Sequence, residues 1–407
     1  MDQQTAQSTQ DVRGLRLLLA STGVAVTGQG MVTAAAPLLA ASLTRDPVLV
    51  SAVTAASYAA WLAFGLPAGA LVDRWPRRRV LVATDLSRAL LLAAFTVLLV
   101  VDAANIATLI AAVFLLGIGA CFFDPAAQAA IPALVGREKT ALSKANGKLW
   151  ALDTFGRSLA GPPLGAGAFA VVAALPFGVH TAALLCSALL LFGIGGLDRG
   201  RTTDTVHEPV VRAIGAGVRF LARHAELRAL GLGMAVYNFG FNLAFAPFVL
   251  YAQDRLGVGD FGFGVLVAAM AVGGIAGGWI ASRIPARVTA RHVYAFSLFV
   301  QAIGWTLTLL TGSAWLAGGA LALVGLASTT VSVVGGSARQ LLTPDEILGR
   351  VVSGTRLLGI GAAGLGALAG GAVAEIAGLS APFVAAATLL TFAALPFLKR
   401  PTGTATS

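Results

Sequence analysis

The sequence predicts an all-α, polytopic membrane protein with twelve transmembrane helices in two pseudo-symmetric six-helix bundles. Hydrophobic residues make up 57% of the 407 residues and charged residues only 11%, whereas a soluble domain carries about 25% charge. Long apolar runs alternate with short polar loops, and a membrane span needs about 20 apolar residues. We therefore expect lipid to be the main solvent and no sizeable soluble domain.

The apolar runs give twelve spans, and the longer ones must tilt or project beyond the bilayer. Their bounds are 15–43, 48–72, 80–101, 105–135, 142–172, 175–197, 227–251, 261–281, 292–311, 314–342, 348–374 and 382–398. The longest polar interval divides the spans six and six. The predicted parts are a tail at 1–13, a bundle at 14–197, a linker at 198–226, a second bundle at 227–398 and a tail at 399–407.

The loop from Gly69 to Arg79, GALVDRWPRRR, assigns a side to every span. Its four arginines cannot enter hydrocarbon, and short loops this basic mark the cytoplasmic side. With both termini inside, all but three of the 28 lysines and arginines lie on the inner side or at inner helix ends. Arg45 and Arg255 fall outside, and Arg157 lies within a span. This bias accounts for the net charge of +10 without nucleic acid.

The linker contains a segment with helical amphipathic spacing. Within 209–224, apolar residues alternate with Arg212, Arg219 and Arg223, which predicts a helix with one basic face. Such a helix suits the inner membrane surface, and a plain linker helix is the alternative.

Repeated residues indicate that the two bundles are related. When Gly69 is placed over Gly278, Arg74 falls on Arg283 and Pro76 on Pro285. The same spacing relates Gln128 and Pro132 to Gln340 and Pro344, and Gly161 and Gly165 to Gly366 and Gly370. Such halves commonly flank a substrate site at the membrane midplane.

Three charged residues are expected at mid-depth, where charge is costly and usually functional. Asp124 and Asp153 each lie about 16–18 Å from the inner end of a span, counted at 1.5 Å per residue. Asp153 and Arg157 share one helix face because they are four residues apart. We expect Asp124 or Asp153 to bind and release a proton, and Arg157 to balance the negative charge of that carboxylate. The alternatives are a permanent Asp153–Arg157 pair that holds the span in place and direct contact with substrate.

Four motifs resemble those of the major facilitator superfamily. The Gly69–Arg79 loop resembles its signature between spans two and three, G-x-L-x-D-R-x-G-R-R/K, with Pro76 in place of the second glycine. The fifth span holds GPPLGAG at 161–167, which resembles the G-P-x-x-G-G signature of drug–proton antiporters, with Ala166 in place of its last glycine. The segment 117–120 resembles the end of R-x-x-x-G-x-G-A, whose coupling arginine is Val113 here. FFDPA at 122–126 and LSKAN at 142–146 resemble the efflux branch that contains macrolide and enterobactin exporters.

The resemblance covers nearly all of residues 14–398 and implies roles for several residues. The loop acts as a gating latch on the inner side, and its alternative role is to set topology alone. Latch residues are Gly69, Asp73, Arg74, Arg77 and Arg78, with Asp85 and Arg88 as support. Gly161, Pro162 and Gly165 form a hinge that seals the exit, or a plain small-residue contact. If the family fold holds, a central cavity is lined by Gln29, Tyr58, Trp61, Phe122, Tyr237, Asn238, Phe241, Asn242 and Phe245.

The resemblance implies a secondary active transporter that exports bulky, partly apolar, drug- or natural-product-like molecules by proton antiport with alternating access. A siderophore exporter and a proton-coupled importer of a small nutrient are the alternatives. Nucleotide-binding, protease and hydrolase motifs are lacking, so no enzyme is expected, and no Cys/His cluster suggests a metal or cofactor. The expected partners are a small-molecule substrate, protons and membrane lipid, without nucleic acid. We expect a monomer in the inner (plasma) membrane with both termini cytoplasmic.

Overall fold

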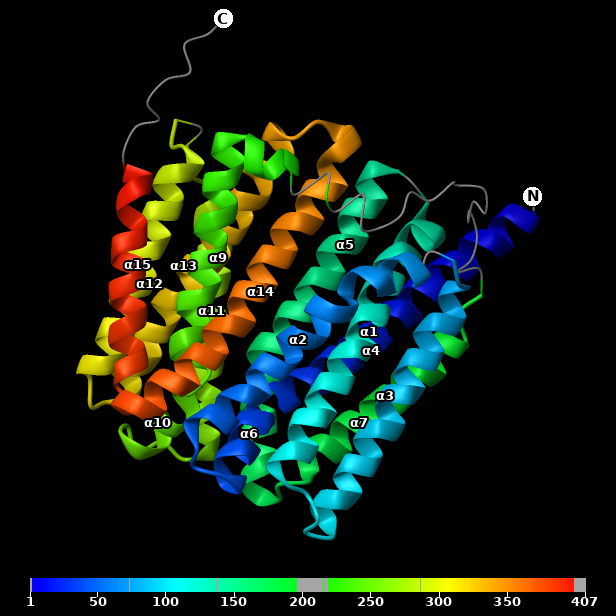
Figure 1. Cartoon of the computed structure of the whole chain (residues 1–407). Helices are drawn as coiled ribbons and strands as arrows, with labels where there is room; N and C mark the ends of the chain where they lie inside the picture. The colour runs from blue at the N-terminus through cyan, green and yellow to red at the C-terminus, as the bar shows by residue number, and fades with distance from the viewer. Residues whose placement is uncertain are drawn as a thin grey trace, which may run out of the picture. The chain divides into compact units, whose positions relative to one another are not determined.

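The structure is a computed structural model that describes residues 2–72, 74–136, 138–195, 215, 219–285 and 287–398. These residues form helices and turns and no strand (Figure 1). The elements, in chain order, are α1 (Asp2–Leu43), α2 (Pro47–Val72), α3 (Arg77–Val100), α4 (Ile106–Val135), α5 (Lys139–Asp153), the π-helix η1 (Thr154–Ala160), α6 (Gly161–Val171), α7 (Leu175–Phe192), α9 (Ala225–Phe245), α10 (Phe248–Asp254), α11 (Asp260–Ala281), α12 (Ala290–Leu310), α13 (Ala314–Leu342), α14 (Asp345–Ala377) and α15 (Ala381–Leu398).

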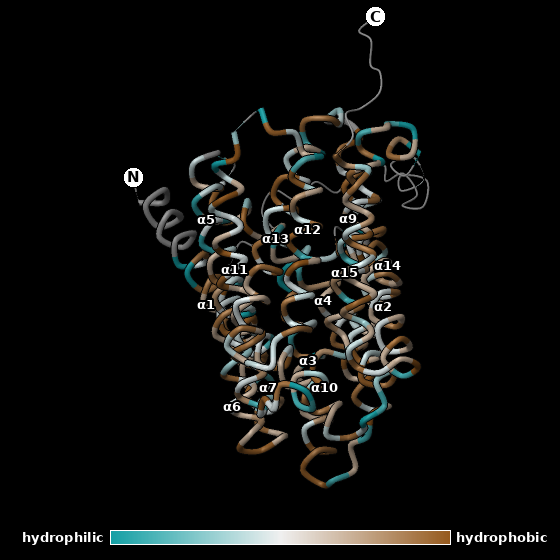
Figure 2. The backbone as a smooth tube through the Cα atoms, turned by 90° about the vertical axis from the view of Figure 1, so that its left-hand side faces the viewer, coloured by the Kyte–Doolittle hydropathy of each residue, from teal (hydrophilic) through white to brown (hydrophobic). Residues whose placement is uncertain are grey.

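Among the described residues, eleven helices are long and apolar enough to cross a membrane, with α9 and α10 together forming one of them. The remaining predicted span, 142–172, corresponds to α5, η1 and α6, which a π turn divides. Hydrophobic residues predominate along the helices, and several turns are hydrophilic (Figure 2). The predicted all-α fold with multiple membrane spans is confirmed. The predicted amphipathic segment 209–224 lies mostly outside the described residues.

Local sequence signals fix the ends of α4. The Asn105 side chain accepts a hydrogen bond from the Thr108 backbone N–H, and the Thr108 hydroxyl accepts one from the Asn105 N–H. This capping box satisfies donors that the first helical turn leaves unpaired. The helix stops at Gly136, whose φ of 75° is strained for residues with a Cβ. Along its length α4 lies beside α3.

Packing divides the chain into two compact units. Unit 1 comprises Met1–Arg45, Ala56–Val210 and Gly259–Ala268, and unit 2 comprises Asp46–Ala55, Val211–Val258 and Ala269–Ser407. Each unit therefore holds most of one predicted bundle together with the first turns of one helix from the other. Unit 2 contains the start of α2, and unit 1 contains the start of α11. The predicted domain bounds stay a prediction.

Small residues make these exchanged helix starts pack closely. In unit 2, a Cβ added to Gly371 of α14 would lie 2.7 Å from the Pro47 carbonyl oxygen of α2. In unit 1, a Cβ on Gly264 of α11 would lie 2.6 Å from the Pro162 carbonyl oxygen of α6. Glycine lets the backbones meet at a distance that a side chain would prevent.

The predicted repeat is visible in equivalent glycine contacts inside each unit. In unit 1, a Cβ on Gly165 of α6 would overlap the backbone of Met31 on α1. In unit 2, a Cβ on Gly370 of α14 would overlap the backbone of Leu243 on α9. The two contacts use the glycines whose spacing is repeated in the sequence, so α1–α6 and α9–α14 are equivalent helix pairs.

A second pair of equivalent contacts joins α3 to α7 in unit 1 and α12 to α15 in unit 2. In the first, the rings of Phe95 and Phe177 meet edge to face with centroids 5.3 Å apart. In the second, the rings of Trp305 and Phe383 meet in the same way at 5.8 Å. Both contacts are antiparallel, because the end of one helix meets the beginning of the other.

Candidate functional site

The fifth predicted span is broken directly before the Gly-Pro-Pro motif. The Gly161 N–H donates to the Gly156 carbonyl, which is the five-residue step of a π turn. Pro162 and Pro163 have no N–H, so the α-helical bonds that would cross this point cannot form. The result is η1, and π turns within helices are frequent at functional sites.

The backbone of η1 and α6 lies directly on α1. A Cβ on Gly30 would lie 2.5 Å from the Arg157 carbonyl oxygen, and one on Gly161 would lie 2.6 Å from Gly30 Cα. Gly161 and Gly165 therefore pack inside their own half, whereas Pro162 faces Gly264 at the start of α11. Of the three predicted hinge residues, Pro162 is the one that contacts α11, a helix assigned by sequence to the other bundle. A seal between the bundles would need a contact of this kind.

Asp153 and Arg157 form the pair that their spacing predicts. Both Nε and Nη2 of Arg157 lie 2.8 Å from Asp153 Oδ1. The side chains are partly exposed, at 43% for Asp153 and 31% for Arg157. Asp124 lies on α4 and is half-buried.

Asp85 and Arg88 occupy a more secluded position than a supporting role for a surface loop suggests. Their side chains are 0% and 6% exposed, and Arg88 Nη1 lies 3.5 Å from Asp85 Oδ1. The hydroxyl of Ser187 on α7 donates to Asp85 Oδ2 at 2.6 Å. The Arg88 guanidinium also lies 5.9 Å from the centre of the Phe123 ring on α4. Three helices thus surround one buried ion pair.

The predicted latch loop is only partly described. Asp73 lies outside the described residues, and a Cβ at Gly69 would meet nothing within 4 Å. Arg78 donates from Nη2 to the Phe192 carbonyl at the end of α7, and its guanidinium lies 4.6 Å from the centre of the Phe192 ring. Arg74 is exposed and Arg77 half-buried. Arg78 therefore joins two helices of the same bundle.

A cavity of about 530 Å³ lies beside this loop in unit 1. The rings of Trp75 and Phe122 stack at its edge, with centroids 6.2 Å apart and an angle of 11° between planes. Its other lining residues are Pro76, Arg79, Val80, Ala83, Thr84 and Ser87. Phe122, expected to line a central cavity, thus contributes to a pocket within its own unit.

The other predicted lining residues fall into two sets. In unit 1, Gln29, Tyr58 and Trp61 are half-buried. On α9 of unit 2, Asn238, Phe241 and Phe245 are half-buried, whereas Tyr237 and Asn242 are only 2% and 1% exposed. The Tyr237 hydroxyl donates to the Val324 carbonyl at 3.3 Å, and the Asn242 amide donates to the Asn238 carbonyl at 3.0 Å. Tyr237 and Asn242 therefore take part in helix packing within unit 2.

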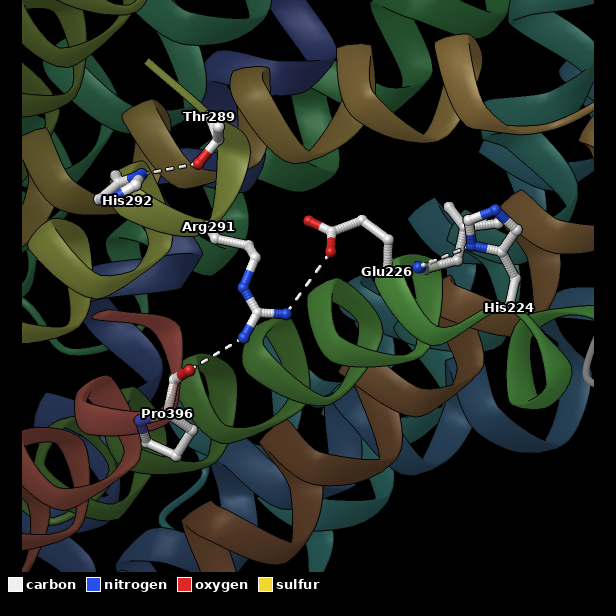
Figure 3. Close-up of polar contacts among 7 residues, drawn as sticks. His224, Glu226, Thr289, Arg291, His292 and Pro396 are labelled. Carbon is white, nitrogen blue, oxygen red and sulfur yellow. Dashed lines mark hydrogen bonds and ion pairs between the residues drawn. The ribbon is translucent and has the colours of Figure 1, made fainter. Parts of the chain in front are cut away.

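Arg291 in unit 2 makes the same kind of contact as Arg78 in unit 1. Arg291 of α12 donates from Nη2 to the Pro396 carbonyl of α15 at 2.9 Å, and its Nη1 lies 3.5 Å from Glu226 Oε2 of α9 (Figure 3). Its guanidinium lies 5.5 Å from the centre of the Phe397 ring. Sequence reasoning assigned Arg291 only to the inner side. The signal was an arginine at the start of one helix and a phenylalanine at the end of its antiparallel neighbour.

No metal centre is formed by the described residues, which contain no group of three or more His, Cys, Asp or Glu side chains able to hold an ion.

A family model described as a transmembrane secretion effector matches residues 9–405. The chain belongs to that family. The family is part of the major facilitator superfamily, so the chain is a multi-pass membrane transporter and not an enzyme. Small molecules are the class of substrate that such transporters bind.

The multidrug efflux pump Tap of Mycolicibacterium fortuitum is 29% identical over 385 residues, which cover 91% of each chain. Among solved structures, the nucleoside transporter NupG matches with a TM-score of 0.78 at 10% identity, over 95% of this chain and 99% of that one. A bacterial homologue of the iron transporter ferroportin in an inward-facing state matches with a TM-score of 0.75 at 17% identity, over 96% and 99%. At these identities, the solved structures establish the fold.

Proposed function

We propose that this transporter exports bulky, partly apolar small molecules by proton antiport with alternating access. The observation that carries the proposal is the similarity to a multidrug efflux pump over 91% of both chains. The broken fifth span adds support, because a helix with missing backbone bonds bends at less cost than a regular one. Drug-like and natural-product-like molecules are the proposed substrates.

We assign proton coupling to charged groups of the first bundle, with Asp124, Asp153 and Arg157 as candidates. The Asp153–Arg157 pair supports this assignment, because both side chains are partly exposed and can change partners without first being uncovered. In this mechanism, protonation of the carboxyl releases Arg157 for another partner. If the pair only holds α5 and η1 together, Asp153→Asn leaves proton-driven transport unchanged.

The proposed latch consists of Gly69, Asp73, Arg74, Arg77 and Arg78, and the proposed seal of Gly161, Pro162 and Gly165. The tie from Arg78 to the end of α7 supports the latch, because it fixes the loop to the first bundle. The contact between Pro162 and Gly264 supports the seal, since the two residues come from different predicted bundles. Asn238, Phe241 and Phe245, with Gln29, Tyr58, Trp61 and Phe122, are the remaining candidates for binding substrate.

The transport experiment uses inverted membrane vesicles acidified inside, with ethidium and a macrolide antibiotic as probes. Export from the cell predicts that the vesicles accumulate a probe and release it when an uncoupler collapses the gradient. Vesicles from cells without the protein are the control. Accumulation by right-side-out vesicles under an inward proton gradient would instead identify an importer, and tests with a siderophore distinguish the remaining exporter class.

Orientation is tested by labelling Arg77→Cys in a background without Cys121 and Cys186. We propose the inner membrane with both termini cytoplasmic, so a membrane-impermeant maleimide should label this position in inverted vesicles and not in intact cells. Asp102→Cys, at the opposite end of α3, should show the reverse pattern. Labelling of Arg77→Cys in intact cells would contradict the topology.

A further inference from the structure

The contact between α3 and α7 encloses polar groups that the transport scheme above does not use. Asp85, Arg88 and Ser187 are almost completely buried there, and His180 of α7 is only 1% exposed. Among the described residues, Asp85 Oδ1, Arg88 Nε and His180 Nδ1 have no hydrogen-bond partner. Each buried polar atom without a partner lowers the stability of the folded protein, so this cluster destabilises the first bundle.

The cluster lies at mid-depth in its helices. Arg88 is about 16 Å along α3 from the first residue of the helix, counted at 1.5 Å per residue. Neighbouring glycines provide the space. A Cβ on Gly119 of α4 would lie 2.6 Å from Arg88 Cδ, and one on Gly28 of α1 would overlap the His180 ring. The first bundle is therefore shaped around these side chains.

The equivalent contact in unit 2 shows that the fold does not require charge at this place. Arg78 and Arg291 are the second residues of α3 and α12, and each bonds a carbonyl at the end of the antiparallel partner. Counted from the same starting points, Asp85 corresponds to Leu298 and Arg88 to Gln301. On the partner helices α7 and α15, counted from the first residue of each, Ser187 corresponds to Ala393 and His180 to Ala386, in the register that also relates Phe177 to Phe383.

Leu298, Gln301 and Ala386 are each 0% exposed. One bundle thus packs this contact with a leucine, a glutamine and alanines, and the other with an ion pair, a serine and a histidine. An ion pair buried where the other bundle has uncharged residues is weak support for stability, and intramembrane ionisable groups are usually functional.

We propose that Asp85 is the proton-binding carboxylate of this transporter, with Arg88 as its counter-charge and Ser187 as the hydroxyl that holds it. The proposal rests on the proposed proton antiport and names the site where the proton binds. It places that site inside the first bundle and not at the partly exposed Asp153–Arg157 pair.

Proton binding changes the partners of both side chains. The proton adds to the Asp85 carboxylate, and the resulting O–H donates to Ser187 Oγ, which has until then donated to Asp85 Oδ2 at 2.6 Å. Arg88 loses its counter-charge. Its guanidinium already interacts electrostatically with Asp124 of α4 and Arg157 of η1, and His180 of α7 interacts with both arginines. Asp124 is the acidic group that can then attract Arg88, so proton uptake on α3 is transmitted to α4.

Infrared difference spectroscopy after a pH change tests the proton site without a transported substrate. The purified protein in lipid nanodiscs should show a protonated-carboxyl band that Asp85→Asn removes. The exposed Asp102→Asn variant is the matched control and should keep the band. If Asp153→Asn removes the band and Asp85→Asn retains it, the proposal is overturned and Asp153 is the carrier.

Transport provides the second readout, with the probe that wild-type vesicles accumulate. Asp85→Asn should lose gradient-driven accumulation and keep downhill exchange of the probe. Accumulation at the wild-type level would overturn the proposal. If the wild type itself shows no gradient-driven accumulation, the proposed antiport fails, whereas the infrared band still decides whether Asp85 binds a proton.

A double variant addresses the case in which Asp85→Asn does not fold because Arg88 is left without a counter-charge. Asp85→Leu with Arg88→Gln copies the residue pair found at the equivalent positions of α12, which unit 2 accommodates in full burial. This variant should fold and exchange the probe without responding to the gradient. Retained coupling in the double variant would overturn the proposal.

Discussion

Two carboxylates of the first bundle each have an arginine three or four residues further along the chain, and the surroundings of the two pairs differ greatly. Asp153 and its partner are 43% and 31% exposed, and exposed ion pairs contribute about 0–1 kcal/mol to stability. Asp85 and Arg88 are buried, and breaking a buried pair by removing one partner costs about 3–5 kcal/mol. Asp153→Asn should therefore alter stability far less than Asp85→Asn does.

Gly165 supplies a test of close backbone packing at a single residue. Gly165→Ala should lower the free energy of unfolding by about 1–3 kcal/mol, because the added methyl overlaps the Met31 backbone. The melting temperature of the purified protein measures the effect. Gly147→Ala is the matched control, because a Cβ there would meet nothing within 4 Å. Removing a helical glycine at Gly147 should stabilise by about 0.5–1 kcal/mol, and equal effects of both variants would contradict the contact.

Residue positions along one helix could be predicted more reliably than the groups that face them. The spacing of Asp153 and Arg157 predicts their pairing, because both partners lie on the same segment. Asp85 and Arg88 lie near the inner end of the third span, so the sequence predicts only that they support the neighbouring latch loop. That Ser187 and His180 approach α3 depends on the packing of α7, which no local pattern specifies.

At the scale of the element, η1 shows how two prolines act on the turn before them. Replacing Pro162 and Pro163 together with alanine restores two N–H donors, which can bond the carbonyls of residues 158 and 159. The span should then become a regular α-helix, gaining up to about 3 kcal/mol of stability and transporting more slowly. Melting temperature and initial uptake rate are the measurements. Pro47→Ala, at the first position of α2 where proline is well tolerated, is the control, and faster transport by the double variant would refute the argument.

Arg291 holds the ends of three helices together, which predicts a local loss of stability without it. Arg291→Ala removes a charge-assisted hydrogen bond to the Pro396 carbonyl, and such bonds contribute about 1.5–3 kcal/mol. Amide hydrogen exchange at the end of α15 should accelerate. The exposed Arg287→Ala should change stability by less than about 0.5 kcal/mol. Unchanged exchange in Arg291→Ala would show that the bond does not hold α15.

The order of the apolar spans could be predicted because lipid leaves few alternatives for an apolar run of this length. The division of the span 142–172 into three elements could not. The prolines were visible in the sequence, but the wide turn begins at Thr154, several residues earlier. The position of this π turn depends on where Gly30 and Gly161 allow the backbone of α1 to approach the backbone of η1 and α6.

At the scale of the whole molecule, the exchanged helix starts are the contacts that the proposed alternating access would break. Ala55 of α2 packs in unit 2 with Ala246, the residue directly after α9, and with Ala367 of α14. Ala55→Cys with Ala367→Cys should therefore form a disulfide on mild oxidation. If these helices separate in each transport cycle, the cross-link stops transport and a reducing agent restores it. Each single cysteine variant is the control, and full transport by the cross-linked protein would mean that this contact stays closed throughout the cycle.

The pairing of two related bundles could be predicted from repeated glycines and the six-and-six division. The exchange of helix starts could not, since Asp46–Ala55 and Gly259–Ala268 are composed like the rest of their spans. The helices that these two segments contact depend on which small residues face them in the folded protein. The close contacts are possible at Gly371 and Gly264 because these residues have no side chain. Nothing in the sequence around them distinguishes them from the many other glycines.

The position of Asp46–Ala55 also imposes an order on biosynthesis. This segment leaves the ribosome early, whereas Ala246 and Gly371, against which it packs, are synthesised long after it. During the interval, the start of α2 must be shielded by lipid or by the insertion machinery. If the two bundles are expressed as separate fragments, the start of α2 in the first fragment lacks its packing partners until the second fragment binds. Co-expression of the two fragments should therefore give a higher yield of each than expression alone.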